Sequence, residues 1–211
     1  MTQSLIVNAQ NPQARPLAQA GTALRAGAVI AFPTDSCYAL GCHLGDKAAL
    51  DRLRAIRAID ERHHLTLMCR DLSDIAKYAR VDNRQYRLLK ATTPGSYVFI
   101  LEGAKELPRR VMHPKRKTIG LRVPDHLVAQ AILCELGEPL LTATLRLPDE
   151  EEPPTEAWQI AEALEGRVEL VIDSGVCGIQ PTTVIDLTRT APELVRAGRG
   201  ALEPFGFSGA G

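Results

Sequence analysis

Apolar positions repeat along the chain at two spacings, one typical of helices and one of buried strands. Residues 12–27 show the helical spacing and end at Gly27, which suits a helix C-terminus. Residues 46–57 show it again behind Asp46, a residue type favoured at an N-cap. Further helices are predicted over 71–79, 82–91, 125–136 (opened by Asp125) and 155–164 (capped by Thr155).

Short apolar runs lie between these segments and predict buried strands. The runs cover 28–32, 65–69, 97–102, 118–123, 140–145, 170–173 and 183–187, with a last short strand at Val195. Strands and helices alternate, but some strands follow one another directly. This mixture indicates an α/β or α+β domain with a mixed sheet rather than a doubly wound nucleotide fold.

One segment interrupts the pattern by its composition. Residues 148–154 read PDEEEPP, and acids with prolines are typical of an exposed, mobile loop. Buried strands follow this segment, so we interpret it as a loop and not as a domain boundary.

The charge is balanced overall but uneven locally. Among 211 residues, Lys and Arg total 25 and Asp and Glu total 25, so a general attraction to nucleic acid is not indicated. The stretch from Arg109 to Arg122, RRVMHPKRKTIGLR, nevertheless holds six basic residues and no acidic one. Such a run predicts an anion site, although a solvated basic loop has the same composition.

The cysteines and histidines do not predict a metal centre. Five cysteines without a CxxC pair suit reduced thiols in the cytoplasm, and a zinc site lacks both spacing and paired ligands. No apolar run reaches the roughly 18 residues that span a bilayer, so no membrane association is expected. His63 and His64 would make a poor bidentate site, because neighbours on a strand point to opposite faces, and we expect both to be structural or merely exposed.

Hydroxyl-rich segments lie at the ends of two predicted strands and could converge on the same place as the basic stretch. Residues 32–36 read FPTDS and residues 181–186 read PTTVID. Ser and Thr can donate to phosphate or carboxylate oxygens, and Asp35 can hold an ammonium group. Taken alone, the segment 32–36 is more typical of a turn stabilised by its own hydroxyl or carboxylate groups. Neither a P-loop, a GxGxxG fingerprint nor a GxSxG elbow is present.

Together these segments resemble a known family. FPTDSCYALG, the turn at Thr93–Gly95, TIGLRVP over 118–124, the strand at 140–145 and PTTVID over 181–186 are similar to the YrdC/YciO family, the threonylcarbamoyl-AMP synthase fold. The resemblance covers residues 10–205. It implies one YrdC-like domain with a twisted mixed sheet, flanking helices and a basic concave cleft.

The resemblance also implies a reaction. In the synthases, L-threonine and bicarbonate give a carbamate that attacks the α-phosphorus of ATP, and the product serves threonylcarbamoyladenosine formation at position 37 of tRNA. ATP would be a substrate here, with Mg²⁺ carried on it and no dedicated protein metal site. The chemistry needs cations for the triphosphate and hydroxyls that orient both substrates.

Site residues follow by matching the motifs. The resemblance implies catalytic roles for Arg57 and Arg146, and contact with the amino acid by Ser36, Arg122 and Thr144. The implied nucleotide-binding residues are Arg57, Thr118, Thr182, Thr183 and Arg199, with Arg196 as an alternative to Arg199 for closing the cleft.

Two departures from the synthase pattern indicate the YciO branch. The synthase Lys-x-Arg becomes Arg57-Ala58-Ile59, so the second cation is missing, and Ser-x-Asn becomes Thr144-Leu145-Arg146. Losing a cation that faces a triphosphate is expected to weaken catalysis, which Arg146 could partly offset. We therefore expect weak or altered activity.

An alternative function is RNA binding without efficient catalysis. The cleft would then hold double-stranded RNA or tRNA through Arg109, Arg110, Lys115, Arg116 and Lys117, with Tyr38 or Tyr97 offering stacking. The basic run lacks interleaved aromatic residues, so sequence-specific readout of single strands is not predicted. A folded remnant that only associates with other proteins is a third possibility.

Overall fold

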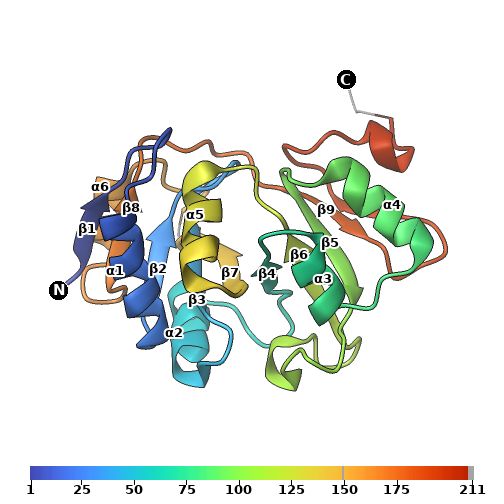
Figure 1. The fold of residues 1–211 in the computed structure, drawn as a ribbon, viewed down its shortest axis with the longest axis horizontal. Helices are drawn as coiled ribbons and strands as arrows, with labels where there is room; N and C mark the ends of the chain where they lie inside the picture. The colour runs from blue at the N-terminus through green and yellow to red at the C-terminus, as the bar shows by residue number, and fades with distance from the viewer. Residues whose placement is uncertain (149, 209–211) are drawn as a thin grey trace.

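The computed structural model describes residues 1–148 and 150–208, and within them one mixed β-sheet organises the chain (Figure 1). Its strands are β1 (Gln3–Ile6), β2 (Val29–Phe32), β3 (Ala39–His43), β4 (Thr66–Met68), β5 (Tyr97–Glu102), β6 (Thr118–Arg122), β7 (Leu140–Thr144), β8 (Leu170–Asp173), β9 (Thr183–Asp186) and β10 (Glu193–Arg196). The helices are α1 (Ala14–Arg25), α2 (Lys47–Arg57), α3 (Leu72–Tyr78), α4 (Asn83–Thr92), α5 (Leu127–Leu136) and α6 (Ala157–Ala163).

The strands lie in the order β1-β8-β2-β3-β7-β4-β6-β5-β9-β10. Parallel pairing joins β1 to β8, β2 to β8, β4 to β6 and β5 to β9. The remaining neighbours are antiparallel. The predicted mixed sheet is confirmed, because hairpin pairs such as β2–β3 alternate with crossovers through helices.

Helices on the sheet enclose two hydrophobic clusters. Helices α1 and α5 lie side by side in front of β2 in Figure 1, and their buried residues, such as Leu24 and Ile132, join Phe32 in one cluster. The second cluster contains Leu53 of α2 and Ile160 of α6. Burial on both faces explains why most strands are continuous apolar runs without alternation.

Most predicted elements are confirmed within a few residues, but two helix starts differ. Helix α5 has His126 and not Asp125 as its N-cap, since His126 Nδ1 accepts the amide of Ala129 at 3.4 Å. Helix α6 begins behind Glu156 and not Thr155. The predicted cap at Asp46 is confirmed: its carboxylate accepts the Ala49 amide at 2.9 Å.

Two strands, β1 and β3, were not predicted from the sequence. Strand β1 is short and mostly exposed, and β3 contains Gly41 within the motif that resembles a family signature. A Cβ at Gly41 would lie 2.6 Å from a methyl carbon of Leu140 and 2.8 Å from the ring of Phe32. The side chains of Leu140 and Phe32 therefore pack directly over Gly41, where a larger residue would not fit. The spacing of apolar residues along the chain does not reveal this tertiary requirement.

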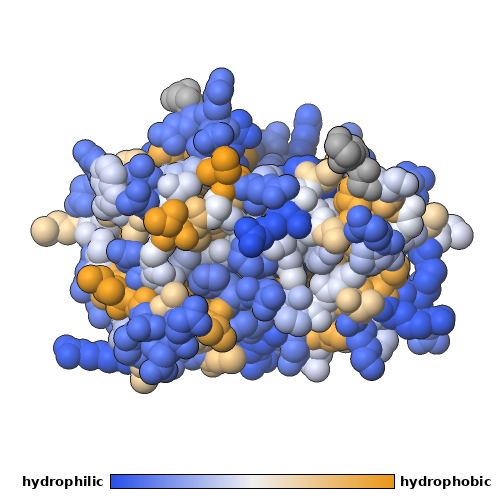
Figure 2. All heavy atoms as spheres, turned by 90° about the horizontal axis from the view of Figure 1, so that it is seen from above, coloured by the Kyte–Doolittle hydropathy of each residue, from blue (hydrophilic) through white to orange (hydrophobic). Residues whose placement is uncertain are grey.

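Within the described residues, no helix combines the length and the apolar character needed to span a bilayer. Figure 2 views the molecule from above: hydrophilic side chains occupy the middle of this face, and hydrophobic ones form small separate groups.

Candidate functional site

Strand ends and loops from distant parts of the chain line a cavity of about 560 Å³. Its polar lining consists of Ser36, Arg57, Arg62, His63, His64, Thr66, Arg122, Thr142, Thr144, Arg146, Glu151, Glu152, Thr182 and Arg196. Five of these side chains are arginines and two are acidic, so the cavity is basic although the chain is neutral. The expected basic cleft is therefore present.

Arg122 lines one side of the cavity and forms a buried ion pair with Asp35, which is not part of the described lining; we call this region the ion-pair end. The carboxylate of Asp35 accepts from the Arg122 guanidinium, and the Arg122 Nη2 lies 3.2 Å from Ser36 Oγ. Ser96 Oγ donates to the other oxygen of Asp35 at 2.6 Å. Burial lowers the pKa of Arg122, and the adjacent Asp35 opposes this shift. The Nε of Arg122 is buried and has no hydrogen-bond partner in the described structure.

The other side holds Arg57 and Arg146, which we call the arginine pair. Arg57, the last residue of α2, donates through Nη1 to the main-chain oxygen of Arg146, beyond the end of β7. Partial burial lowers the pKa of Arg57, and the positive charge of Arg146 lowers it further. The Arg57 Nε is also buried without a partner in the described part of the chain. Two like charges and an unsatisfied donor favour an anion at this end.

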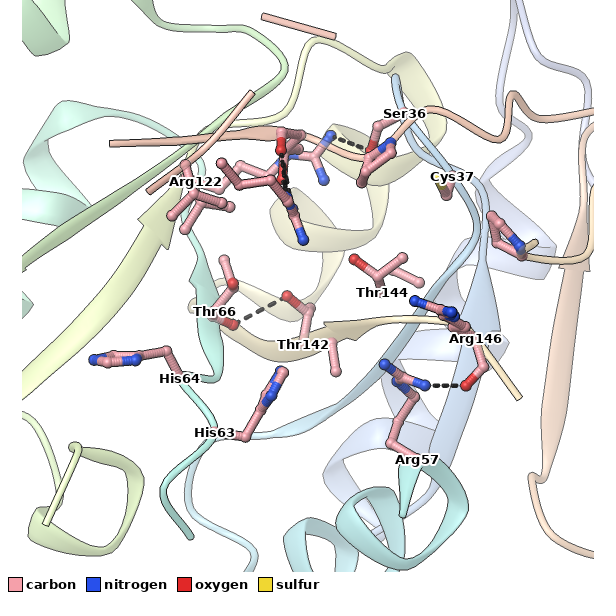
Figure 3. A pocket seen from close by; sticks show the side chains of 18 of the residues that line it. Ser36, Cys37, Arg57, His63, His64, Thr66, Arg122, Thr142, Thr144 and Arg146 are labelled. Carbon is pink, nitrogen blue, oxygen red and sulfur yellow. Dashed lines mark hydrogen bonds between the residues drawn. The ribbon is translucent and has the colours of Figure 1, made fainter. Parts of the chain in front are cut away.

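Hydroxyl groups lie between the two ends. Figure 3 shows Thr144 between Ser36 and Arg146, with Thr142 and Thr66 close by. Thr142 Oγ1 donates to the Thr66 carbonyl at 3.0 Å, whereas no hydrogen bond involves the Thr144 hydroxyl in the described structure. From one end of the cavity to the other, a ligand would therefore meet the ion-pair end, the free Thr144 hydroxyl and the arginine pair.

The residues predicted for the site fall into two groups. Ser36, Arg57, Arg122, Thr144, Arg146 and Thr182 line the cavity, so the convergence of the two hydroxyl-rich segments is confirmed. Thr118, Thr183 and Arg199 are not part of the described lining. Thr183 is fully buried and donates to the Gly200 carbonyl at 2.6 Å, and Thr118 Oγ1 lies 3.0 Å from His64 Nε2.

The basic segment lies outside this cavity, contrary to the expectation that it converges there. Apart from Arg122, its members Arg109, Arg110, Lys115, Arg116 and Lys117 are exposed and absent from the described lining. Three of them, Arg109, Arg110 and Lys117, instead line a smaller hollow of about 220 Å³ beside α2. The chain enters β6 at Thr118, and Arg122 at the other end of that strand lines the main cavity.

The aromatic stacking suggested for RNA is not available in this structure. Tyr38 is fully buried, and its hydroxyl donates to the Gly175 carbonyl at 3.0 Å. Tyr97 is 8% exposed and packs against Phe99 and Phe205. Both rings are structural, because each is buried and its hydroxyl group donates a hydrogen bond to a main-chain carbonyl.

The sequence interpretation missed several residues of the cavity wall. His63 and His64 were expected to be structural or exposed, yet both line the cavity. Arg196, named only as an alternative, lines it and donates to the Thr182 carbonyl at 2.9 Å. Glu151 and Glu152 place the acidic segment at the cavity; Asp149 of that segment lies outside the described residues. Loops carry several of these residues, and apolar periodicity does not predict where loops fold back.

No group of three or more His, Cys, Asp or Glu residues in the described chain is arranged to hold a metal ion. The five cysteines, all in the described ranges, are unpaired, and Cys37 forms part of the cavity wall.

Comparison with known proteins shows which family this chain resembles in sequence and in structure. The Sua5/YciO/YrdC family model, described as "Telomere recombination", matches residues 22–198. The crystal structure of Escherichia coli YciO matches with a TM-score of 0.94 and 49% identity, covering 97% of this chain and all of that one.

More distant relatives have an assigned activity or ligand. The threonylcarbamoyl-AMP synthase of Pyrococcus abyssi is 30% identical over 85% of this chain and 53% of its own length. The crystal structure of Pyrococcus abyssi Sua5 complexed with L-threonine matches with a TM-score of 0.86 and 26% identity, covering 93% of this chain and 58% of that one. The chain thus spans little more than half of these longer proteins. With its matching fold and motifs, the chain belongs to the Sua5/YciO/YrdC family and is related to its threonylcarbamoyl-AMP synthases.

Proposed function

We propose that this chain binds ATP, L-threonine and bicarbonate in the main cavity and forms threonylcarbamoyl-AMP at a low rate. The observation that carries the proposal is that Arg122, held in its ion pair with Asp35, lines the same cavity as the arginine pair Arg57 and Arg146. An amino acid and a polyphosphate are two ligands of different charge, and the cavity has one end suited to each.

The ion-pair end suits a zwitterion. The carboxylate of threonine would pair with the Arg122 guanidinium, and the ammonium group of threonine would pair with the Asp35 carboxylate. Ser36 Oγ lies beside the same guanidinium and can orient the ligand. The L-threonine complex of the Pyrococcus abyssi relative supports an amino-acid ligand in this fold.

The arginine pair suits the phosphates of ATP. In the reaction, the threonine ammonium group first releases a proton to solvent. Its nitrogen then forms a bond to the carbon of bicarbonate, and water leaves. A carbamate oxygen then bonds to the α-phosphorus, while the bond to pyrophosphate breaks. Arg57 and Arg146 would neutralise the phosphate oxygens, and Thr144 and Thr182 would orient them. Mg²⁺ would enter with ATP.

A direct assay tests this proposal. The pure protein is incubated with ATP, bicarbonate and Mg²⁺, with and without L-threonine, and pyrophosphate release is measured. We expect slow release that depends on threonine, with threonylcarbamoyl-AMP detected by mass spectrometry. Absence of nucleotide binding at millimolar ATP would overturn the proposal.

The position of the basic segment favours a second candidate function, RNA binding on an outer surface. Arg109, Arg110, Lys115, Arg116 and Lys117 are exposed, and acidic residues are absent from this stretch. They can reach the phosphates of a double-stranded RNA or a tRNA without entering the cavity. Replacing Lys115, Arg116 and Lys117 by Ala should then weaken RNA binding and reduce its salt dependence while pyrophosphate release is retained. Submicromolar RNA binding without nucleotide binding would favour this function over the first.

A further inference from the structure

The loop between α2 and β4 decides which side chains face the arginine pair. Ala58 adopts a left-handed conformation with φ of 50°, so the chain reverses direction directly after Arg57. Ile59 then packs against the hydrophobic core. The next side chains of this loop to reach the cavity are Arg62 and His63.

The two adjacent histidines have different surroundings. Both residues belong to the cavity lining, but in Figure 3 the His63 ring points toward Thr142, whereas the His64 ring points to the opposite side. His64 is held by Thr118 Oγ1 at 3.0 Å and stacks on His113 with ring centroids 4.8 Å apart. No protein hydrogen bond in the described structure involves the His63 ring. Both of its nitrogens are therefore available to a ligand.

Burial and the charges around His63 favour its neutral form. Partial burial lowers its pKa, and Arg57 of α2 and Arg196 of β10 lower it further, while Asp60 of the same loop opposes them. An anion bound between these cations would reverse the balance, because it would offset the two positive charges and favour a third.

We propose that the His63 imidazole binds the phosphate groups of the ligand beside Arg57 and gains a proton as the anion enters the cavity. This inference rests on the proposed function, since it takes ATP as the ligand. Anion binding and proton uptake are then linked: the complex holds more protons than the free protein. Affinity for ATP rises as pH falls through the pKa of bound His63 and levels off below the pKa of the free ring.

Calorimetry tests the linkage without requiring turnover. ATP in excess Mg²⁺, which keeps the γ-phosphate ionised, is titrated into the full-length protein at pH 7 in buffers of different ionisation enthalpy. We expect uptake of about 0.5 to 1 proton per ATP by the unmodified protein and close to none by His63→Asn. The variant should bind about five- to tenfold more weakly at pH 6, and the difference should shrink toward pH 8.5.

His43→Asn is the matched control. His43 pairs with Glu138 at 3.0 Å, outside the cavity, so its replacement should leave proton uptake unchanged. The His63 ring resonance, followed by NMR in the free and ATP-bound unmodified protein, reports the protonation of the ring directly. Amide resonances of His63→Asn verify that the variant is folded. ATP binding with equal proton uptake in His63→Asn overturns this inference and leaves the proposed function standing. No ATP binding by the unmodified protein overturns both.

Discussion

Asp35 and Arg122 form a buried ion pair between two strand ends that lie 87 positions apart in the sequence. Their side chains are only 8% and 7% exposed. Water therefore screens the pair weakly, and each charge depends on the other for compensation. Arg122 of this pair lines the part of the cavity that we assign to an amino acid, so stability and ligand binding depend on the same ion pair.

Removing one partner should leave the other charge buried. Asp35→Asn is expected to lower the free energy of unfolding by about 3 kcal/mol, because Arg122 loses its compensating carboxylate. Urea unfolding followed by circular dichroism measures this. Asp51→Asn is the control: Asp51 pairs with Lys47 at 3.5 Å on the surface, and its loss should cost less than about 1 kcal/mol. Equal losses in the two variants would contradict the ion-pair argument.

Arg57 should matter more than another arginine on the same helix. Arg57→Ala removes one member of the arginine pair, and we expect threonine-dependent pyrophosphate release to fall at least about 100-fold. Arg52 also lies on α2 but pairs with Glu169 at 2.6 Å outside the cavity. Arg52→Ala should keep the rate within about twofold, as a surface substitution. A similar loss in both variants would indicate that α2 acts only through its stability.

Position 59 does not offer a place for the missing synthase cation. Ile59 packs against the core, so Ile59→Arg should destabilise the fold by about 1–3 kcal/mol and not strengthen ATP binding. Ile59→Leu, which keeps an apolar side chain, should cost less than about 1.5 kcal/mol. Thermal unfolding and ATP titration of both variants check this. Tighter ATP binding by Ile59→Arg at unchanged stability would show that residue 59 faces the cavity.

Stability should depend on pH through His126. Burial lowers its pKa from the ordinary value of 6.5, and its unprotonated Nδ1 caps α5. The unfolded chain therefore binds more protons than the folded one between the lowered pKa and 6.5, so stability is lost as pH falls through this window. His126→Asn keeps a capping oxygen without the titration and should show a smaller loss between pH 7 and pH 5 in urea unfolding. An identical pH dependence in this variant would assign the effect to other groups.

The sequence by itself determined where most helices and strands lie. Apolar spacing is a local property, and both faces of the central strands are buried, so continuous apolar runs marked β5 and β8 with their observed bounds. The motifs over 32–36 and 181–186 also predicted correctly that Ser36 and Thr182 meet in one cavity.

Only the tertiary structure decided which charges face that cavity. The reversal at Ala58 directs Ile59 to the core and His63 to the cavity, and Lys115, Arg116 and Lys117 turn outward although Arg122, on the same basic stretch, is buried. The reason is physical: periodicity fixes the face of a side chain only within a regular helix or strand. In loops, long-range packing and the pairing of buried charges set the direction of each side chain.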